Sequence, residues 1–477
     1  PERLALVELA LDGSRREWSF GEVSDLSARL AGTLRARGVG PGDVVMTLIG
    51  NRPEWVLAML ACFRIGAVAL ACNEQLRARD LRYRIETARP KAITADERNR
   101  SELEAAKPEC PVLMIPLPYD EEPTPARELQ PEDRCLITFT SGTTGEPKGI
   151  VHGQRYLPGQ QLQSEHWLDA RPGDLVWCTA ASGWSKSARN VFIAPWLEGA
   201  AALLHDARFD PGERLELLAR ERVNVLCMAP TEYRVIAKRA ELQPIPSLRA
   251  MVAAGEALNP EVLRAWHEST GLHIRDGYGQ TETGQTTGSP LDQEPRPGSM
   301  GVPLPGVQVQ VLDGELVIAP ASVPTFFLGY LDEHIVRGAD GGWSGADRRA
   351  GEPWRTGDRV RVEDGWLYFE GRSDDVIVSA GYRIGPFEVE SALVAHPAVA
   401  EAAAVAAPDD ERGSVVRAIV VLRDGHSPAS PELARELQDH VKRVTAPYKY
   451  PRIVEFVEEL PKTASGKIKR AELRASG

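Results

Sequence analysis

The sequence has no excess of positive charge, and this argues against one broad class of function. Its 477 residues include 56 Lys and Arg against 68 Asp and Glu, a formal net charge of −12. A protein that binds nucleic-acid phosphates needs a concentrated positive surface. We therefore expect no nucleic-acid partner, although the composition is compatible with local basic sites for small anions. With 43% hydrophobic and 26% charged residues, the chain has the composition of an ordinary globular protein.

The sequence also lacks the cysteine patterns of metal-binding and disulfide-rich proteins. It contains no C-x-x-C pair and no Cys/His cluster with zinc-finger spacing. We expect the cysteines to be reduced and buried, as in a cytosolic enzyme. The six are Cys62, Cys72, Cys110, Cys135, Cys178 and Cys227.

No apolar run is long enough to favour a membrane span. The most apolar stretch, residues 55–72, is interrupted by Arg64, and its pattern predicts a core helix that leads into a strand. The sequence shows no leader peptide. Because it begins at Pro1 rather than Met, we expect that an N-terminal segment could precede it. We expect a cytoplasmic protein.

The order of the apolar segments predicts an α/β fold. Residues 1–297 alternate between helical and strand-like patterns with continuous apolar strands, as in parallel βαβ units. Residues 298–373 contain short β runs separated by Gly and Asp, which are typical of antiparallel or barrel-like structure. A mixed pattern follows over 374–477. We predict a large domain over 1–373, with α/β lobes and a small β-rich subdomain, and a small α+β domain after it.

The strongest local motif is the stretch LITFTSGTTGEPKG at residues 136–149. An apolar strand leads directly into a loop of hydroxyls and glycines that ends in a lysine. Glycines let backbone N–H groups approach phosphate oxygens, hydroxyls add donors, and the lysine adds a compact positive charge. The spacing G-x-x-G-x-x-K-G differs from the Walker pattern. We predict phosphate binding by Thr140, Ser141, Gly142, Thr143, Thr144, Gly145 and Lys148.

This loop resembles the phosphate loop of the adenylate-forming acyl-CoA synthetases. Four further segments match that family in the expected order: 276–284 (DGYGQTETG), 354–358 (WRTGD), 371–375 (GRSDD) and 461–467 (PKTASGK). The resemblance implies a large AMP-binding domain hinged to a small mobile C-terminal domain. It also implies an ATP-dependent carboxylate–CoA ligase that makes an acyl-adenylate and then an acyl-CoA thioester.

The matched segments indicate how ATP would be bound. Tyr278 offers a ring face for adenine, Thr281 a hydroxyl for the α-phosphate, and Glu282 a hard carboxylate for Mg²⁺, to which the resemblance adds Thr144. By resemblance, Asp358 accepts hydrogen bonds from the ribose hydroxyls. The remaining nucleotide contacts implied by the family are Gly255, Glu256, Ala257, Asp276, Gly277, Gly279, Gln280, Arg372 and Arg383.

Lys467 is the residue most closely tied to catalysis. Attack of a carboxylate on the α-phosphorus brings two anions together, and a positioned ammonium would stabilise the growing charge. In the family, a lysine at this position reaches the reacting groups from the C-terminal domain, and that domain turns about a hinge that matches Asp374. The turn would bring the coenzyme A (CoA) contacts into place. By resemblance these are Ala380, Gly381, Tyr382, Arg412 and Arg443, with Lys442 an equally good neighbour for the last.

Three residues are predicted to line the acyl pocket. The segment GWSKSA at 183–188 resembles medium-chain acyl-CoA synthetases, with Trp184 as an aromatic wall and Lys186 beside it. Gly279 stands where acetate-specific relatives commonly have a tryptophan. A glycine there would open the pocket, and each buried CH₂ of the substrate would contribute roughly 0.8 kcal/mol. We expect medium-chain or aromatic acids to be better substrates than acetate.

Two alternative functions stay open at this point. The chain could be a stand-alone adenylation enzyme that loads a carrier-protein thiol, or a non-catalytic protein that uses ATP as a conformational switch. The joint presence of Lys467, Glu282 and Asp358 argues against the switch. The physiological acid and the oligomeric state, a homodimer among the possibilities, are not determined by the sequence.

Overall fold

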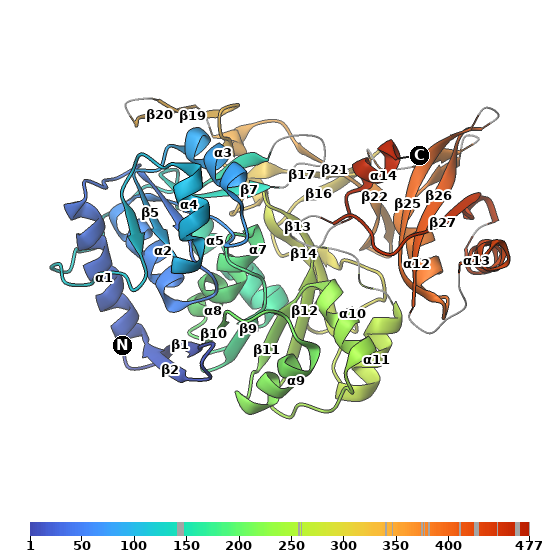
Figure 1. The fold of residues 1–477 in the computed structure, drawn as a ribbon, viewed down its shortest axis with the longest axis horizontal. Helices are drawn as coiled ribbons and strands as arrows, with labels where there is room; N and C mark the ends of the chain where they lie inside the picture. Colours follow the sequence, from blue (N-terminus) through green and yellow to red (C-terminus); the bar gives the residue numbers. More distant parts are fainter. Residues whose placement is uncertain are drawn as a thin grey trace.

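The computed structural model describes most of the chain. The described residues are 1–140, 147–255, 258, 260–338, 341–345, 347–373, 375, 377–379, 382–409, 412–423, 429–445, 447–462 and 468–476. Figure 1 shows a large α/β domain and, at the end of the long axis, a small C-terminal domain. The predicted α/β class with a large and a small domain is confirmed.

The first of two large sheets has nine strands within the described residues, in the order β15-β14-β13-β12-β11-β9-β10-β1-β2. Its central strands, β13 to β1, run parallel, as the alternation of strands and helices predicts. The strands are β1 (Leu4–Leu9), β2 (Arg15–Ser19), β9 (Leu175–Cys178), β10 (Ala201–His205), β11 (Val225–Met228), β12 (Ala250–Ala254), β13 (Ile274–Gln280), β14 (Gly284–Gly288) and β15 (Val302–Pro303).

The second large sheet has the order β18-β8-β7-β4-β3-β5-β6. Its strands are β3 (Val44–Leu48), β4 (Val68–Ala71), β5 (Ala92–Ala95), β6 (Val112–Met114), β7 (Arg134–Thr140), β8 (Lys148–Gly153) and β18 (Gly329–Tyr330). Strand β6 pairs with β5, so part of the Pro- and acid-rich stretch 111–133 belongs to this sheet.

Alternating side chains place the core on both faces of the sheets. On β11, Val225 and Cys227 face the core between the two sheets, and Leu226 and Met228 face the opposite core. Helices α9 (Pro211–Arg220), α10 (Pro230–Arg239) and α11 (Pro260–Thr270) cover that opposite face.

The helices begin and end where the sequence indicates. Helix α1 (Phe20–Ala36) begins after Ser19, whose hydroxyl accepts from the backbone of Glu22, while the Glu22 carboxylate accepts from Ser19. Helix α2 (Pro53–Ile65) ends at Gly66 with φ +74°, and it leads into β4. The apolar stretch 55–72 is thus a buried helix and strand, as predicted, and among the described residues no helix is long and apolar enough to cross a membrane.

The large domain contains further helices and helical turns. They comprise α3 (Ala78–Ala88), α4 (Arg100–Ala106), α5 (Tyr156–Gly159), α6 (Gln161–Gln163), α7 (Ser185–Ala188) and α8 (Ala194–Leu197), the π-helical segments η2 (Ser164–Leu168) and η3 (Arg189–Ile193), and the 3₁₀ segments η1 (Glu97–Asn99), η4 (Pro320–Ser322) and η5 (Arg348–Ala350).

The six cysteines are free, and all but the half-buried Cys110 are buried, as expected.

A four-stranded antiparallel sheet, β16-β17-β21-β22, forms the β-rich part that the sequence predicts after residue 297. Its strands are β16 (Val309–Leu312), β17 (Glu315–Ile318), β21 (Trp354–Glu363) and β22 (Trp366–Arg372), and a separate hairpin pairs β19 (Ile335–Arg337) with β20 (Trp343–Gly345).

The small domain packs helices on a three-stranded sheet, β25-β26-β27. Its elements are β23 (Ile377–Ser379), β24 (Tyr382–Ile384), α12 (Pro386–Val394), β25 (Val399–Asp409), β26 (Gly413–Leu422), α13 (Pro431–Val444), η6 (Pro447–Lys449), β27 (Ile453–Phe456) and α14 (Arg470–Ala475).

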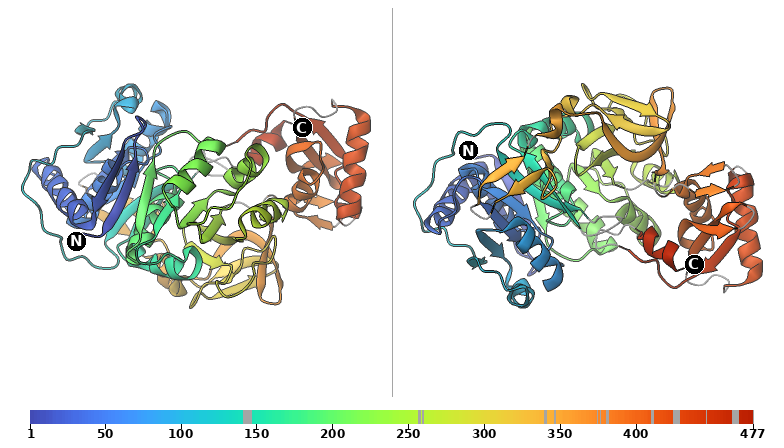
Figure 2. Two further views of the ribbon diagram at one scale, coloured as in Figure 1. Left: turned by 90° about the horizontal axis from the view of Figure 1, so that it is seen from below. Right: turned by 90° about the horizontal axis from the view of Figure 1, so that it is seen from above.

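Helix α14 is held against the start of the small domain by ion pairs. Arg474 forms an ion pair with Asp375 at 2.5 Å, and Arg470 forms one with Glu390 at 2.8 Å. Figures 1 and 2 show α14 on the side of the small domain that faces the large one. The two domains also meet at Lys238 of α10, whose Nζ donates to the Ala400 carbonyl at 3.1 Å.

Candidate active site

The predicted phosphate loop connects two adjacent strands. Strands β7 and β8 are antiparallel, and Thr140 at the end of β7 pairs with Lys148 at the start of β8. The two ends of the loop are therefore held side by side by the sheet. Ser141, Gly142, Thr143, Thr144 and Gly145 lie outside the described residues.

Lys148 is already neutralised by an acidic side chain. Its Nζ lies 2.6 Å from Oε1 of Glu333 and 4.9 Å from the centre of the Tyr330 ring. The side chains of Lys148 and Glu333 are both about half exposed. A phosphate that binds Lys148 would have to compete with this exposed ion pair.

Tyr330 connects the lysine to the predicted metal ligand. Its hydroxyl donates to Oε1 of Glu282 at 2.8 Å. Burial raises the pKa of the Glu282 carboxyl above its ordinary value, and the hydrogen bond from Tyr330 works in the opposite direction. The Glu282 carbonyl accepts from the backbone of Phe327, which fixes the turn that contains Thr281 and Glu282.

Asp358 is the centre of the strongest hydrogen-bond cluster in the site. Its Oδ2 accepts from the Tyr278 hydroxyl at 2.5 Å and from Nε2 of Gln280 at 2.8 Å. Its Oδ1 accepts from Nη1 of Arg372 at 3.2 Å. Asp358 is only 5% exposed, so these donors replace most of the water that its carboxylate would otherwise bind.

Three of the matched sequence segments therefore meet at one carboxylate. Tyr278 and Gln280 come from β13, Asp358 from β21, and Arg372 from the end of β22. Trp354, at the start of β21, adds a hydrogen bond from its indole N–H to Oε1 of Gln280 at 2.9 Å. The residues predicted to bind the nucleoside are assembled by tertiary structure rather than by proximity in the sequence.

Asp276 and Gly277 occupy the middle of β13. Burial raises the pKa of the Asp276 carboxyl to about 8, although its Oδ1 accepts a hydrogen bond from the backbone of Gly277. A side chain at position 277 would collide with Gln285 and Trp167, which explains the glycine. Near neutral pH, Asp276 is therefore largely a neutral carboxyl group.

The predicted acyl-pocket segment lies between the two large sheets. Gly183 has φ +84°, and an added Cβ would lie 2.2 Å from the backbone nitrogen of Asn73. Trp184, half-buried, follows it as the N-cap of α7. Nζ of Lys186 lies 3.4 Å from the carbonyl of Ala254, directly before Gly255. Lys186 therefore reaches the predicted adenine loop, of which Glu256 and Ala257 lie outside the described residues.

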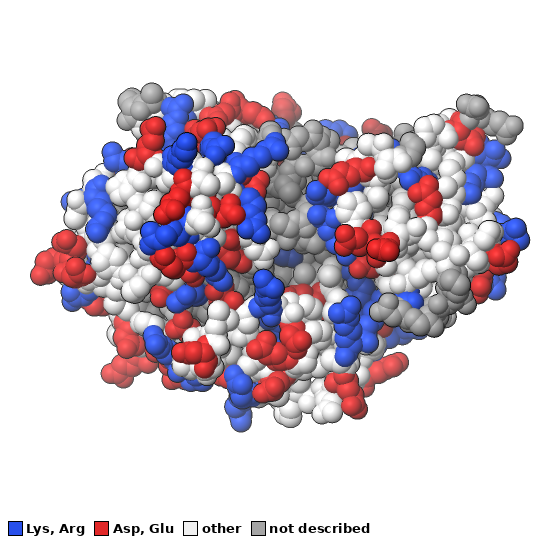
Figure 3. Space-filling model, viewed as in Figure 1, with Lys and Arg blue, Asp and Glu red and all other residues white. Residues whose placement is uncertain are grey.

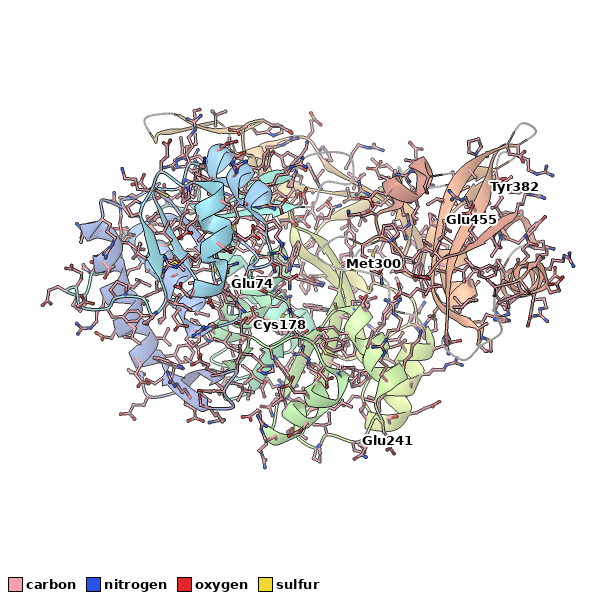
Figure 4. The ribbon with its side chains drawn as sticks, in the orientation of Figure 1. Glu74, Cys178, Glu241, Met300, Tyr382 and Glu455 are labelled. Atoms are coloured by element: carbon pink, nitrogen blue, oxygen red, sulfur yellow. The ribbon has the colours of Figure 1, made fainter. Side chains whose placement is uncertain are left out.

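Figure 4 marks Cys178 in this interior, where its Sγ lies 4.0 Å from the Lys186 carbonyl. Cys178 pairs in register with Cys227 on the neighbouring strand β11. Both side chains are buried, so the lysine lies over a hydrophobic part of the sheet.

The structure gives Gly279 a second role. An added Cβ would lie 1.9 Å from the carbonyl oxygen of Gly284, so this position requires glycine for close backbone packing with β14. The opening of the acyl pocket by Gly279 stays a prediction. A tryptophan at this position would also have to displace the backbone of β14.

The predicted CoA contacts on the small domain are only partly described. The Tyr382 ring, half exposed, stacks on Tyr448 with centroids 4.4 Å apart, and Figure 4 shows Tyr382 on the small domain. Lys442 pairs with Asp439 at 2.9 Å, whereas Arg443, on the same helix, is exposed. The backbone N–H of Arg412 donates to Asp409.

Several predicted residues lie outside this geometry. Asp374, Ala380, Gly381 and Lys467 are not among the described residues, and of Arg383 only the backbone is described, paired with Val378 in the β23–β24 hairpin. Their roles stay predictions. The face shown in Figure 3 is indented between the large domain and the small one, and its acidic and basic side chains are interspersed.

Sequence reasoning missed Tyr330 and Glu333. Tyr330 is the last residue of β18, which pairs with β8 beside the phosphate loop, and Glu333 lies in the turn after that strand. An aromatic residue at the end of a two-residue strand and an acid in the following turn carry no motif, because their roles depend on the strand that pairs beside them. The pairing of β18 with β8 is the signal that would have identified them.

The chain matches two family models and many known proteins over most of its length. Residues 1–331 match the family described as AMP-binding enzyme, and residues 388–467 match the AMP-binding enzyme C-terminal domain. The chain is 39% identical to the acyl-coenzyme A synthetase ACSM3, mitochondrial, of Mus musculus, over 97% of this chain and 85% of the relative. It is 38% identical to the uncharacterized acyl–CoA ligase YtcI of Bacillus subtilis, over 99% and 93%.

Solved structures give the same result. The anthranilate CoA ligase AuaEII, solved in complex with anthranoyl-AMP, is 29% identical with a TM-score of 0.86, over 99% of this chain and 94% of that one. A benzoate CoA ligase from Burkholderia xenovorans LB400 is 27% identical with a TM-score of 0.86, over 99% and 96%. The chain therefore belongs to the AMP-binding enzyme family, as an acyl-CoA synthetase that uses ATP and coenzyme A.

Proposed function

We propose that this AMP-forming acid–CoA ligase acts on medium-chain or aromatic acids through the residues that its sequence motifs identify. The observation that carries the proposal is the carboxylate of Asp358, held by Tyr278, Gln280 and Arg372. This arrangement suits the sugar of a nucleotide, because a preorganised carboxylate accepts hydrogen bonds from two neighbouring hydroxyls. Ribose binding would use the remaining acceptor capacity of Asp358.

The first half-reaction joins the acid to AMP. The substrate carboxylate attacks the α-phosphorus, the bond to the β-phosphate breaks, and pyrophosphate leaves. We assign the phosphates to the loop between Thr140 and Lys148, the α-phosphate to Thr281, and the stabilising ammonium to Lys467, with Arg383 as a further phosphate contact. The protein acts mainly by positioning and charge neutralisation.

We propose Mg²⁺ as the metal ion, held by Glu282 and Thr144. The Glu282 carboxylate fits a hard cation, because it is half-buried and, among the described residues, the Tyr330 hydroxyl is the only side-chain group that donates a hydrogen bond to it. When bound, the ion would neutralise charge on the ATP phosphates. Tyr330 would orient Glu282 toward it, and the raised pKa of Glu282 would make metal binding weaken as the pH falls.

The second half-reaction transfers the acyl group from AMP to the CoA thiol: the carbon–sulfur bond forms, the bond from the acyl carbon to the phosphate oxygen breaks, the thiol gives up its proton, and AMP leaves. We propose that the chain pivots at Asp374, so that Lys467 leaves and Ala380, Gly381 and Tyr382 approach. Arg412 and Arg443 would then bind the CoA phosphates. Of the basic pair on α13, the exposed Arg443 is the better candidate, because Lys442 is engaged with Asp439 and the Tyr450 ring.

We also propose a cytoplasmic location. Its support is the set of free, mostly buried cysteines, which suits a reducing compartment. Fractionation of cells that express the tagged full chain would test this, and enrichment in a membrane or organelle fraction would contradict it.

The function is tested by two measurements on the purified protein. Acid-dependent exchange of labelled pyrophosphate into ATP reports adenylation, and mass spectrometry of CoA thioesters reports the second step. The panel runs from acetate to dodecanoate and includes benzoate. We expect exchange and thioester formation with the longer and aromatic acids. A clear preference for acetate would contradict the substrate class, and transfer to a carrier protein but not to CoA would favour the carrier-loading alternative.

A further inference from the structure

Arg189 is a buried cation without a counter-charge. It begins η3 in the large domain, is 4% exposed, and its Nε and Nη1 have no hydrogen-bond partner. No carboxylate forms an ion pair with it among the described residues. The other buried arginines that the structure describes have partners: an acidic side chain for Arg155, Arg214, Arg337 and Arg417, and the Asp80 carbonyl with the Phe139 ring for Arg84.

Arg189 borders the predicted acyl pocket. It follows Trp184 and Lys186 on the same short helical stretch. Its Nη1 lies 3.6 Å from the position that a Cβ on Gly284 would occupy, and Gly284 is the residue whose carbonyl packs against Gly279. The guanidinium therefore lies close to Gly284, which packs against Gly279, one of the residues predicted to line the pocket.

The groups around Arg189 supply no negative charge. His152 is 1% exposed, and burial lowers its pKa to about 3, with the positive charges of Arg189 and Arg155 as further causes. His152 is therefore neutral, and it interacts with the backbone of Thr281, the predicted α-phosphate contact. The buried phenol of Tyr156, whose pKa burial raises to about 12, is neutral as well.

A guanidinium removed from water needs hydrogen-bond acceptors, because desolvation of a charge is costly unless polar partners replace the lost water. Arginine also stays protonated in proteins, so it cannot escape this cost by losing its proton. A purely hydrocarbon acyl chain would leave Nε and Nη1 without partners. An acyl chain with an oxygen at its far end would supply the missing acceptor.

We propose that Arg189 is a specificity-determining residue of the acyl pocket and that it binds an oxygen acceptor on the distal part of the acid substrate. The inference rests on the proposed function and narrows its substrate class from plain fatty or aromatic acids to oxygenated ones. A second carboxylate, a hydroxyl and a carbonyl share this chemistry.

The test compares pairs of acids of matched length. Hexanoate is paired with 6-hydroxyhexanoate and with adipate, and benzoate with 4-hydroxybenzoate and with terephthalate. For wild type we expect kcat/KM in pyrophosphate exchange to favour an oxygenated member by at least tenfold. The hydroxyl and carboxylate arms identify which acceptor is bound.

Arg189→Met, which keeps the length of the side chain without its charge, should reduce or reverse this ratio and leave the KM for ATP unchanged. Arg189→Lys should retain part of the preference for a carboxylate. Arg264→Met, at an exposed position on α11, is the matched control and should leave the ratio as in wild type.

A measurement on wild type alone covers the case in which the variants do not fold. The oxygenated acid should raise the midpoint of thermal unfolding more than its plain partner does. A wild-type preference for plain acids, or an equal effect of Arg189→Met on both members of a pair, would assign Arg189 a structural role with bound water and overturn the inference alone. Absence of exchange with every acid would overturn the proposed function and this inference together.

Discussion

The Tyr278 hydroxyl donates a hydrogen bond to Oδ2 of Asp358 across 2.5 Å, and this contact joins the largest sheet of the protein to the β-rich sheet. The two residues are 80 positions apart in the sequence. Because the acceptor is a carboxylate with little exposure to water, the bond belongs to the stronger class of hydrogen bonds. It therefore gives a direct test of the nucleotide site.

Replacing Tyr278 by Phe should weaken ATP binding. A hydrogen bond to a charged group contributes about 1.5–3 kcal/mol, so we expect the KM for ATP to rise about tenfold or more. Steady-state kinetics of AMP formation measures this. Tyr448→Phe, on the small domain, is the matched control. An unchanged KM for ATP in Tyr278→Phe would separate the Asp358 cluster from nucleotide binding.

The hydrogen bond from Tyr330 to Glu282 predicts a shift in pH dependence. Burial raises the pKa of Glu282, and the hydrogen bond from Tyr330 lowers it. Tyr330→Phe should therefore move the pKa further up, and the acidic limb of kcat/KM for Mg·ATP should move to higher pH. The profile is measured between pH 5 and 8 at saturating acid substrate. If the acidic limb of kcat/KM in Tyr330→Phe stays at the wild-type pH or moves to a lower pH, Glu282 is not the titrating group.

The pair between Lys148 and Glu333 predicts a gain in affinity. Exposed ion pairs contribute about 0–1 kcal/mol, so releasing Lys148 with Glu333→Gln should lower the KM for ATP by up to about fivefold. The effect should fade at high salt, because the pair is exposed. Lys148→Gln gives the opposite direction, and a rise in KM for Glu333→Gln would mean that Glu333 itself helps to bind the substrate.

Asp276 should make the stability of the large domain fall as the pH rises. Its folded pKa of about 8 lies above the ordinary value of 3.8, so between these values the folded state binds more protons than the unfolded state. This contribution is fully present below about pH 4 and is lost as the pH passes through 8. Asp276→Asn should flatten the decrease in the thermal midpoint between pH 5 and 8, and an identical slope in the variant would refute the raised pKa.

Lys467→Gln tests the division of labour between the two half-reactions. The variant should lose pyrophosphate exchange by about 10²–10³-fold, because one charge-stabilising group is removed. It should still convert supplied acyl-adenylate to acyl-CoA. Acetylation of Lys467 would have the same effect through loss of the charge. Equal loss of both reactions in the variant would contradict the assignment.

The arrangement of strands and helices follows largely from local patterns in the sequence. The capping box at Ser19 and the glycine at position 66 mark real helix ends, and the continuous apolar strands are parallel in the structure. The short strand β6 is not evident from the sequence, because three residues in a Pro-rich stretch give no clear period of two. Its position at the edge of the sheet is set by pairing with β5.

The site was predictable where residues belong to motifs, and not where they depend on neighbours. Tyr278, Gln280, Asp358 and Arg372 each lie in a matched segment, and the structure brings them together. Tyr330 contacts Glu282 although it is 48 residues away in the sequence, in the two-residue strand β18, which carries no motif. The lack of partners around Arg189 is likewise a property of the packed interior, which no sequence pattern records.

The ion pairs of α14 have a mechanical consequence. Arg470 forms an ion pair with Glu390, and Arg474 forms one with Asp375. The helix that follows Lys467 is therefore attached to the residue directly after position 374. A rotation of the backbone at position 374 would then move helix α14 and its ion-pair partners together as one rigid unit. A small change in the backbone torsion angles at position 374 would thus produce a large displacement of the C-terminal end of the chain. Removal of the Arg474–Asp375 ion pair would uncouple α14 from this rotation without affecting the rotation itself.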